Sequence, residues 1–252
     1  MIHFFAEWKK IHRRKLWLLY VVAILIILLW NTATLLRNPF SEQETLTGYN
    51  YLILSLSLVN QMFLPVILAA CASRICDIEA KGDTYKLLFT MQSRSSLFKN
   101  KIFINVTYIL AMNLIQYTFV LVIGQIIHVT QPVPWSSLNF MFLGFFCIDT
   151  ALYILQQSLS LLMKNPLMPL FIGLFGTFIG IFTAFFPDLP LRFLFPWGYY
   201  ITLCPVNLHY DKASETALYY LIDLPWPWLA ILMVFGIAVY LTGKHLFLKK
   251  EV

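Results

Sequence analysis

Long apolar runs alternate with short polar segments along most of this chain. A helix that crosses the hydrocarbon core of a bilayer needs about 20 mostly apolar residues. Six runs meet that length, and they cover Leu16–Leu36, Tyr51–Ile75, Ile102–Ile127, Leu138–Met163, Leu167–Phe186 and Trp226–Gly243. The pattern predicts an all-α integral membrane fold with six transmembrane helices in a single domain, residues 1–252.

Residues 1–15 form a separate unit before the first run. Phe4, Phe5, Trp8 and Ile11 recur at helical spacing, and the basic residues fall largely on the other side of the helical wheel. This pattern is typical of a short amphipathic helix in the membrane interface. A basic anchor that only sets topology is a compatible alternative. The apolar run that follows is too long for a signal peptide, and no A-x-A site follows it.

Residues 187–225 are apolar but interrupted by proline, so they cannot simply span the membrane. Pro187, Pro190, Pro196 and Pro205 break the segment into short pieces. Irregular backbone at membrane depth is tolerated only where protein or a water-filled cavity surrounds it. We expect short helices that dip into the outer leaflet and return to the same side, as a re-entrant segment between helices 5 and 6.

Composition supports the membrane class. The chain is 60% hydrophobic and only 12% charged, whereas soluble domains carry about 25% charged residues. With the N-terminus inside, fifteen Lys and Arg residues flank the inner ends of the runs and three lie outside. This bias places both termini in the cytoplasm of a multi-pass membrane protein. The net charge of +6 therefore reflects topology, and we expect no nucleic-acid partner.

Signals for catalysis and metal binding are missing from the sequence. It contains no GxxxxGK[ST], HExxH or GxSxG motif, and its five histidines are far apart. Cys71, Cys76, Cys147 and Cys204 have no CxxC or metal-ligand spacing, so we interpret them as free thiols. We expect no enzyme activity, no metal and no cofactor on this chain.

Asp149 is an ionisable residue deep within a predicted span. An acid at that depth is costly unless it is solvated, paired or protonated. Gln156 and Ser160 follow it on the same helical face. The stripe could line a pathway or a subunit interface. Alternatively, Asp149 lies nearer the outer end, or is a neutral acid bonded to a neighbouring helix.

The second, third and fifth runs carry further candidates for packing or substrate contact. Asn60 and Gln61 lie in the second run, and Asn113 and Gln116 in the third. Such residues form hydrogen bonds between membrane helices, and substrate contact is the alternative role. In the fifth run, Gly176, Gly180 and Ala184 form a small-xxx-small face that lets another helix approach closely.

The segment Cys76–Lys101 is a polar island between the second and third runs. Its charges predict a cytoplasmic loop that begins with a turn near Glu79 and continues as a short helix over Thr84–Met91. A merely solvated loop does not need the apolar residues within YKLLF, which must be buried on the membrane interface or on a partner. We therefore expect a docking element, formed by Glu79, Gly82, Asp83, Thr84, Tyr85, Lys86, Leu87 and Leu88.

These features together resemble the permease subunits of ABC-2 type transporters. The loop residues Glu79, Gly82, Thr84, Lys86, Leu88, Ser93, Arg94 and Lys101 match the family pattern, with Asp83 as a departure. The opening Glu7-Trp8-Lys9-Lys10-Ile11-His12-Arg13-Arg14 resembles the family's E-x-x-K-x-x-R start. The size and the stretch TYKLLFTMQSRSSLFKNK are similar to those of the lantibiotic-immunity permeases of bacteria.

The resemblance implies a function and partners. The docking element would be a coupling helix that binds a separate ATP-binding cassette subunit, which carries the ATP and Mg. A second permease, identical or not, would complete an exporter in the bacterial plasma membrane. The implied cargo is a hydrophobic cationic antimicrobial peptide. The alternatives are an ABC-2 permease for another lipid-like or drug substrate, or a membrane immunity or sensor protein that uses no ATP.

Overall fold

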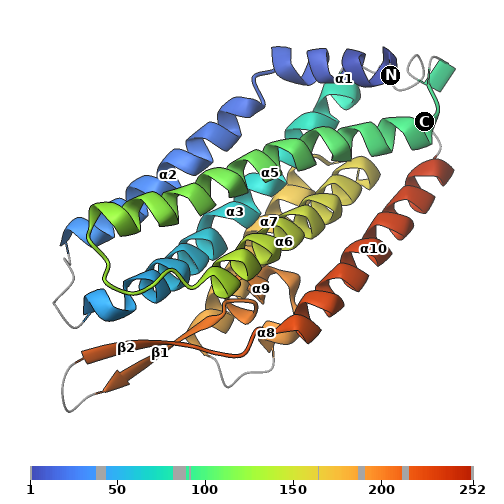
Figure 1. Ribbon diagram of the computed structural model, residues 1–252. Helices are drawn as coiled ribbons and strands as arrows, with labels where there is room; N and C mark the ends of the chain where they lie inside the picture. The colour runs from blue at the N-terminus through green and yellow to red at the C-terminus, as the bar shows by residue number, and fades with distance from the viewer. Residues whose placement is uncertain are drawn as a thin grey trace.

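A computed structural model describes residues 2–37, 44–81, 89–90, 92–163, 165–186, 191–211 and 216–250. Long helices dominate it (Figure 1). The long elements are α1 (Ile2–Arg13), α2 (Trp17–Arg37), α3 (Gly48–Lys81), α5 (Arg94–Ile126), α6 (Trp135–Leu162), α7 (Leu167–Phe185) and α10 (Trp226–Lys249). The short elements are η1 (Glu44–Thr47), α8 (Leu191–Leu194), η2 (Pro196–Gly198), α9 (Tyr199–Thr202), β1 (Val206–Asp211) and β2 (Thr216–Leu221).

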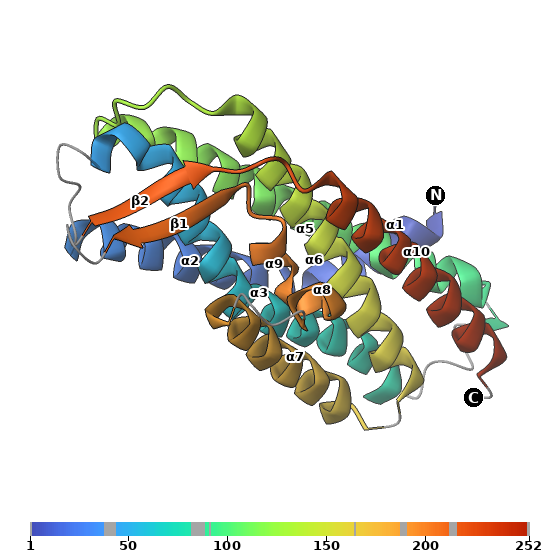
Figure 2. The same cartoon turned by 90° about the horizontal axis from the view of Figure 1, so that it is seen from below.

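The long helices after α1 run side by side and give the bundle two distinct ends. The end with α1 and both chain termini is called the terminal end below, and the end with β1 and β2 the hairpin end (Figures 1 and 2). Helix α3 is central, because it packs against α2, α5, α6 and α7. Helix α10 packs mainly on α6 at one edge of the bundle.

Outward-facing side chains identify the surroundings of this bundle as lipid. On α2 the buried residues are Tyr20, Ala23, Ile27, Asn31 and Leu35, a single stripe at helical spacing. The other faces expose large apolar side chains, which would not be stable in water. Among the described residues, α2, α3, α5, α6 and α10 are long and apolar enough to cross a membrane. The chain is therefore a multi-pass membrane protein.

Helices at the terminal end extend further than predicted, so the predicted loop 76–101 is too long. Helix α3 continues through Lys81, and Glu79 is helical where a turn was expected. Helix α5 already begins at Arg94, where the Oγ atom of Ser93 accepts a hydrogen bond from the backbone N–H of Ser96 at 3.2 Å. Charged residues end the apolar run that the sequence shows. They do not end the helix, because its backbone hydrogen bonds continue past them. Residues 82–88 lie outside the described part of the chain.

The predicted short helices in 187–225 are present as α8, η2 and α9, and the described chain is mostly helical as predicted, with one two-stranded hairpin that was not predicted. Strands β1 and β2 form an antiparallel hairpin, with Val206 opposite Leu221 and Leu208 opposite Tyr219. The hairpin is fixed to the start of α3. The side-chain amide of Asn50 donates to the Tyr219 carbonyl at 3.1 Å, and the rings of Tyr51 and Tyr219 lie 5.2 Å apart.

Helix α1 packs across the terminal end. Lys15 has a φ of 54°, which ends α1 and turns the chain into α2. Trp8 stacks on Tyr108 of α5 with ring centroids 5.6 Å apart, and Ile11 is buried. Lys9, an exposed residue, lies on the outer side. The apolar residues of α1 whose side chains the structure describes therefore contact other helices of the protein.

Candidate functional site

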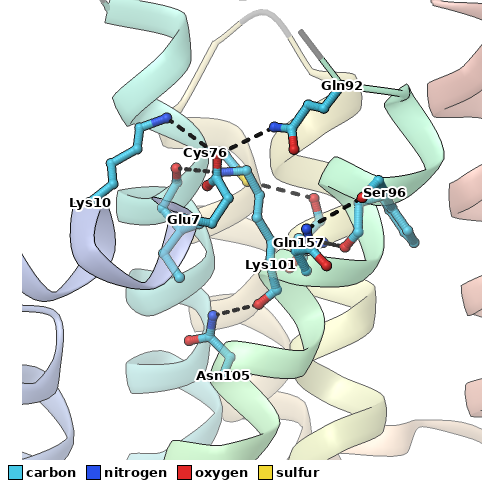
Figure 3. A network of polar contacts seen from close by, with 11 residues as sticks. Glu7, Lys10, Cys76, Gln92, Ser96, Lys101, Asn105 and Gln157 are labelled. Atoms are coloured by element: carbon cyan, nitrogen blue, oxygen red, sulfur yellow. Dashed lines mark hydrogen bonds and ion pairs between the residues drawn. The ribbon is translucent and has the colours of Figure 1, made fainter. Parts of the chain in front are cut away.

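A buried ion pair joins α1 to α5 at the terminal end. The Nζ atom of Lys101 lies 3.9 Å from Oε2 of Glu7, and neither side chain reaches solvent to more than 4% of its area (Figure 3). Lys101 also donates to the Ile75 carbonyl of α3 at 3.3 Å. Burial of two charges is stable only when each is paired and hydrogen-bonded. Three helices therefore meet at Lys101.

The Glu7 carboxylate also contacts a glutamine just before α5 and a lysine on its own helix. Nε2 of Gln92 donates to Oε1 of Glu7 at 3.4 Å, and Lys10 lies 3.8 Å from that oxygen. One turn beyond Lys101, Asn105 donates to the Lys101 carbonyl at 2.9 Å and accepts from the Tyr20 hydroxyl of α2 at 3.1 Å. Figure 3 shows Lys10, Gln92 and Lys101 around the Glu7 carboxylate, and Asn105 beside the Lys101 carbonyl.

Two basic side chains bind the carboxyl ends of helices nearby. Arg94 donates to the carbonyls of Leu248 and Lys250 at 3.0 and 2.6 Å, at the end of α10. Lys250 in turn donates to the Leu161 carbonyl, at the end of α6, at 2.7 Å. Cations are stabilised at helix carboxyl ends, where carbonyls lack helical partners. The guanidinium of Arg94 also lies 4.4 Å from the ring of Phe89.

Polar residues predicted within the spans form two bonded pairs. The side-chain amide of Asn60 on α3 donates to the Gln116 carbonyl oxygen on α5 at 2.7 Å. Asn113 on α5 donates to Asp149 on α6 at 3.0 Å, and both residues are buried. Such bonds between membrane helices contribute about 0.6 to 2 kcal/mol each.

The other two polar candidates lie against the glycines of α7. A Cβ atom at Gly180 would lie 2.9 Å from Nε2 of Gln61, and one at Gly173 would lie 3.0 Å from Nε2 of Gln156. Within the described residues, the side-chain amides of Gln61 and Gln156 have no hydrogen-bond partner. Because Gly173 and Gly180 have no side chain, there is room for these two amides beside α7.

The small-residue face of α7 lies close to Trp197 in addition to α3. At Gly176 a Cβ would lie 2.2 Å from the Trp197 indole, and at Gly180 it would lie 2.7 Å from the Trp197 carbonyl. Trp197 belongs to η2, so the close approach is to a short helical segment. The side chain of Ala184 lies outside the described part of the structure.

A comparison with known protein families identifies the family to which this chain belongs. A family model described as ABC-2 family transporter protein matches residues 4–180. The chain belongs to the ABC-2 transporter family. Among curated proteins, no sequence matches it significantly.

As a member of the ABC-2 transporter family, the chain is the membrane component of a transport system. The match covers α1 to most of α7 and stops before the hairpin and α10. Of the residues that carried the resemblance, Glu7 and Lys101 form an ion pair at the terminal end (Figure 3). Arg94 binds the end of α10 at the same end of the bundle. The docking residues Gly82 to Leu88 and the side chain of Glu79 lie outside the described residues.

Sequence reasoning missed Tyr200 and Trp197 as partners of the polar core of this ABC-2 transporter. The Tyr200 hydroxyl donates to Asp149, which thereby receives one donor from α5 and one from α9. Nothing in the sequence links Tyr200 to Asp149, because 51 residues separate them. Only the three-dimensional path of the chain between α7 and β1 brings them together.

Proposed function

We propose that this chain is the membrane-spanning subunit of an ATP-driven ABC-2 exporter, with its terminal end in the cytoplasm. The supporting observation is the network at that end, where Glu7, Arg94 and Lys101 join α1, α3, α5 and α10 around the entry and exit of the docking segment. A force on residues 82–91 would therefore be shared among several helices at once.

Orientation and span number are part of the proposal. The basic residues of α1, Arg94, Lys101 and the end of α10 gather at the terminal end, as the positive-inside bias requires. Helix α7 is the sixth span, since 19 residues at 1.5 Å each give about 28 Å. That length is near the hydrocarbon thickness of about 30 Å. Residues 187–225 are the re-entrant outer segment, and the whole chain is one permease domain.

The energy source lies on other subunits. Members of this family typically work with an ATP-binding subunit, which would bind the ATP and Mg and dock on residues 79–88. A second permease, identical or different, completes the transporter. The exporter works in the bacterial plasma membrane.

The proposed cargo is an antimicrobial peptide of the lantibiotic type, expelled as self-immunity. Support comes from the loop stretch Thr84–Lys101 and from chain size, as argued above from sequence. A lipid-like or drug substrate is the alternative for the same permease architecture.

Co-purification tests the docking claim. The tagged chain, solubilised gently from its host membrane, should carry a P-loop ATPase identified by mass spectrometry. The double variant Tyr85→Glu/Leu88→Glu should lose at least about tenfold of that ATPase, because charges replace the apolar contacts. The matched control Leu208→Glu/Leu218→Glu changes exposed residues at the hairpin end and should retain it. Full retention in the loop variant contradicts the docking claim.

A further inference from the structure

The junction between α1 and α2 carries a dense group of exposed basic side chains. Its members, called the basic corner below, are Lys9, His12, Arg13, Arg14 and Lys15. Among the described residues, no ion pair or side-chain hydrogen bond involves any of these five side chains. The positive charge of the basic corner is therefore available to a partner outside the chain.

Charge within α1 does not neutralise the basic corner. Glu7 is the acidic residue of α1, and its carboxylate is buried against Lys101 and Lys10. The carbonyl groups at the end of a helix carry about half a negative charge, which is much less than the positive charge gathered here. An anion from outside the chain would therefore be stabilised at this junction.

Contacts between α1 and α5 set the depth of the basic corner. The ion pair of Glu7 with Lys101 and the stacking of Trp8 on Tyr108 join the two helices. At 1.5 Å per residue, these contacts lie about 10 and 20 Å along α5 from its start at Arg94. Helix α1 thus lies closer to the bilayer than the start of α5, at the depth of lipid headgroups (Figure 1).

Lipid-facing side chains follow the basic corner directly. Trp17 and Leu18 are 37% and 44% exposed on α2, within one turn of Lys15. Tryptophan is enriched at the boundary between headgroups and acyl chains. A lipid beside α2 would therefore place its chains on apolar side chains while its phosphate reaches the basic corner. Guanidinium groups bind phosphate through two parallel N–H bonds, which suits Arg13 and Arg14.

We propose that the basic corner is a binding site for an anionic phospholipid, whose phosphate contacts Arg13 and Arg14 and whose acyl chains lie on Trp17 and Leu18. A zwitterionic lipid carries an ammonium group beside its phosphate, so it is held more weakly. Free phosphate has the charge but no acyl chains to contact α2. The site requires neither ATP nor cargo, so it goes beyond the proposed transport function.

Native mass spectrometry of the full chain in detergent tests the site. The chain is titrated with phosphatidylglycerol and with phosphatidylcholine of the same acyl chains, and the Kd of the first bound lipid is compared. Phosphatidylglycerol should bind more tightly. Arg13→Gln/Arg14→Gln should weaken its binding about thirtyfold, which equals about 2 kcal/mol for two basic residues near the membrane surface. Both residues are exposed, so thermal unfolding should be unchanged.

The matched control is Lys99→Gln/Lys249→Gln, which removes the same charge from exposed residues on α5 and α10. It should keep the wild-type Kd for phosphatidylglycerol. An equal loss of affinity in the control and in the arginine variant overturns the site, because net charge alone would then set the affinity. Wild-type affinity in the arginine variant overturns it too, as does equal binding of the two lipids.

A photoreactive lipid locates the site. Phosphatidylglycerol with a photoreactive group beside its phosphate, incorporated in nanodiscs with the full chain, should label residues 9–18 most strongly, as mapped by peptide mass spectrometry. Excess inorganic phosphate should leave this labelling unchanged. Uniform labelling around the bundle overturns the site, and loss of the label in inorganic phosphate overturns a lipid as its ligand.

Discussion

The burial and the ion pair of Lys101 could not be predicted from the sequence. A lysine at the start of an apolar run reads as a topology signal, yet this side chain is entirely buried. Its charge is compensated by Glu7, which the sequence places in a different unit of the chain. The sequence pattern predicted both α1 and α5 but not the contact between them. Such a pattern indicates which residues are buried, but it does not indicate which residues they contact.

Loss of one charge from this pair should be costly. Lys101→Met keeps the side-chain length but removes the buried cation beside Oε2 of Glu7, so we expect destabilisation by up to about 3 to 5 kcal/mol. Thermal unfolding in detergent measures the change. The control Lys99→Met alters an exposed lysine and should stay within about 0.5 kcal/mol of wild type.

Removal of both charges distinguishes the loss of the ion pair from the loss of side-chain packing. The double variant Glu7→Gln/Lys101→Met leaves no uncompensated charge, so it should recover most of the lost stability. A double variant as unstable as Lys101→Met would show that the pair is not what stabilises this end.

At the scale of elements, apolar runs located each long helix after α1 in the described part of the chain, and the errors lie at helix ends and within 191–225. Helix α3 passes the end of its predicted run at Ile75 and continues to Lys81, because backbone hydrogen bonds do not depend on side-chain polarity. Hairpin β1–β2 was missed because prolines on both sides obscured its alternating residues. Contacts with Asn50 and Tyr51 stabilise it, and no local pattern encodes them.

The tight packing of α7 against η2 gives a prediction at this scale. Gly180→Ala places a Cβ 2.7 Å from the Trp197 carbonyl, a backbone atom that cannot move easily. We expect destabilisation by about 1 to 3 kcal/mol, seen as a lower unfolding temperature. The matched control is Gly144→Ala, where the nearest atom is 3.7 Å away.

Gly144→Ala should be neutral or more stable by up to about 1 kcal/mol, because alanine favours helix. Equal unfolding temperatures for the two variants would contradict the close contact between α7 and Trp197.

At the scale of the whole molecule, the two ends of the bundle differ in composition. The terminal end gathers charged residues around the proposed docking segment, and the buried residues of 196–206 pack at the hairpin end. The sequence predicted the polar candidates in the spans, and the structure pairs Asn60 with Gln116 and Asn113 with Asp149. The sequence could not predict these pairs, because helical periodicity shows which residues share one face of a helix but not which helix lies against that face.

ATP-driven export is the central function proposed for this protein, and resistance to a cationic lantibiotic measures it directly. A sensitive strain should express this chain with its partner ATPase, with a partner whose P-loop lysine is replaced, or alone. We predict resistance to nisin only with the intact ATPase. Equal resistance in all three strains would contradict ATP coupling and would identify a membrane immunity protein that works without it.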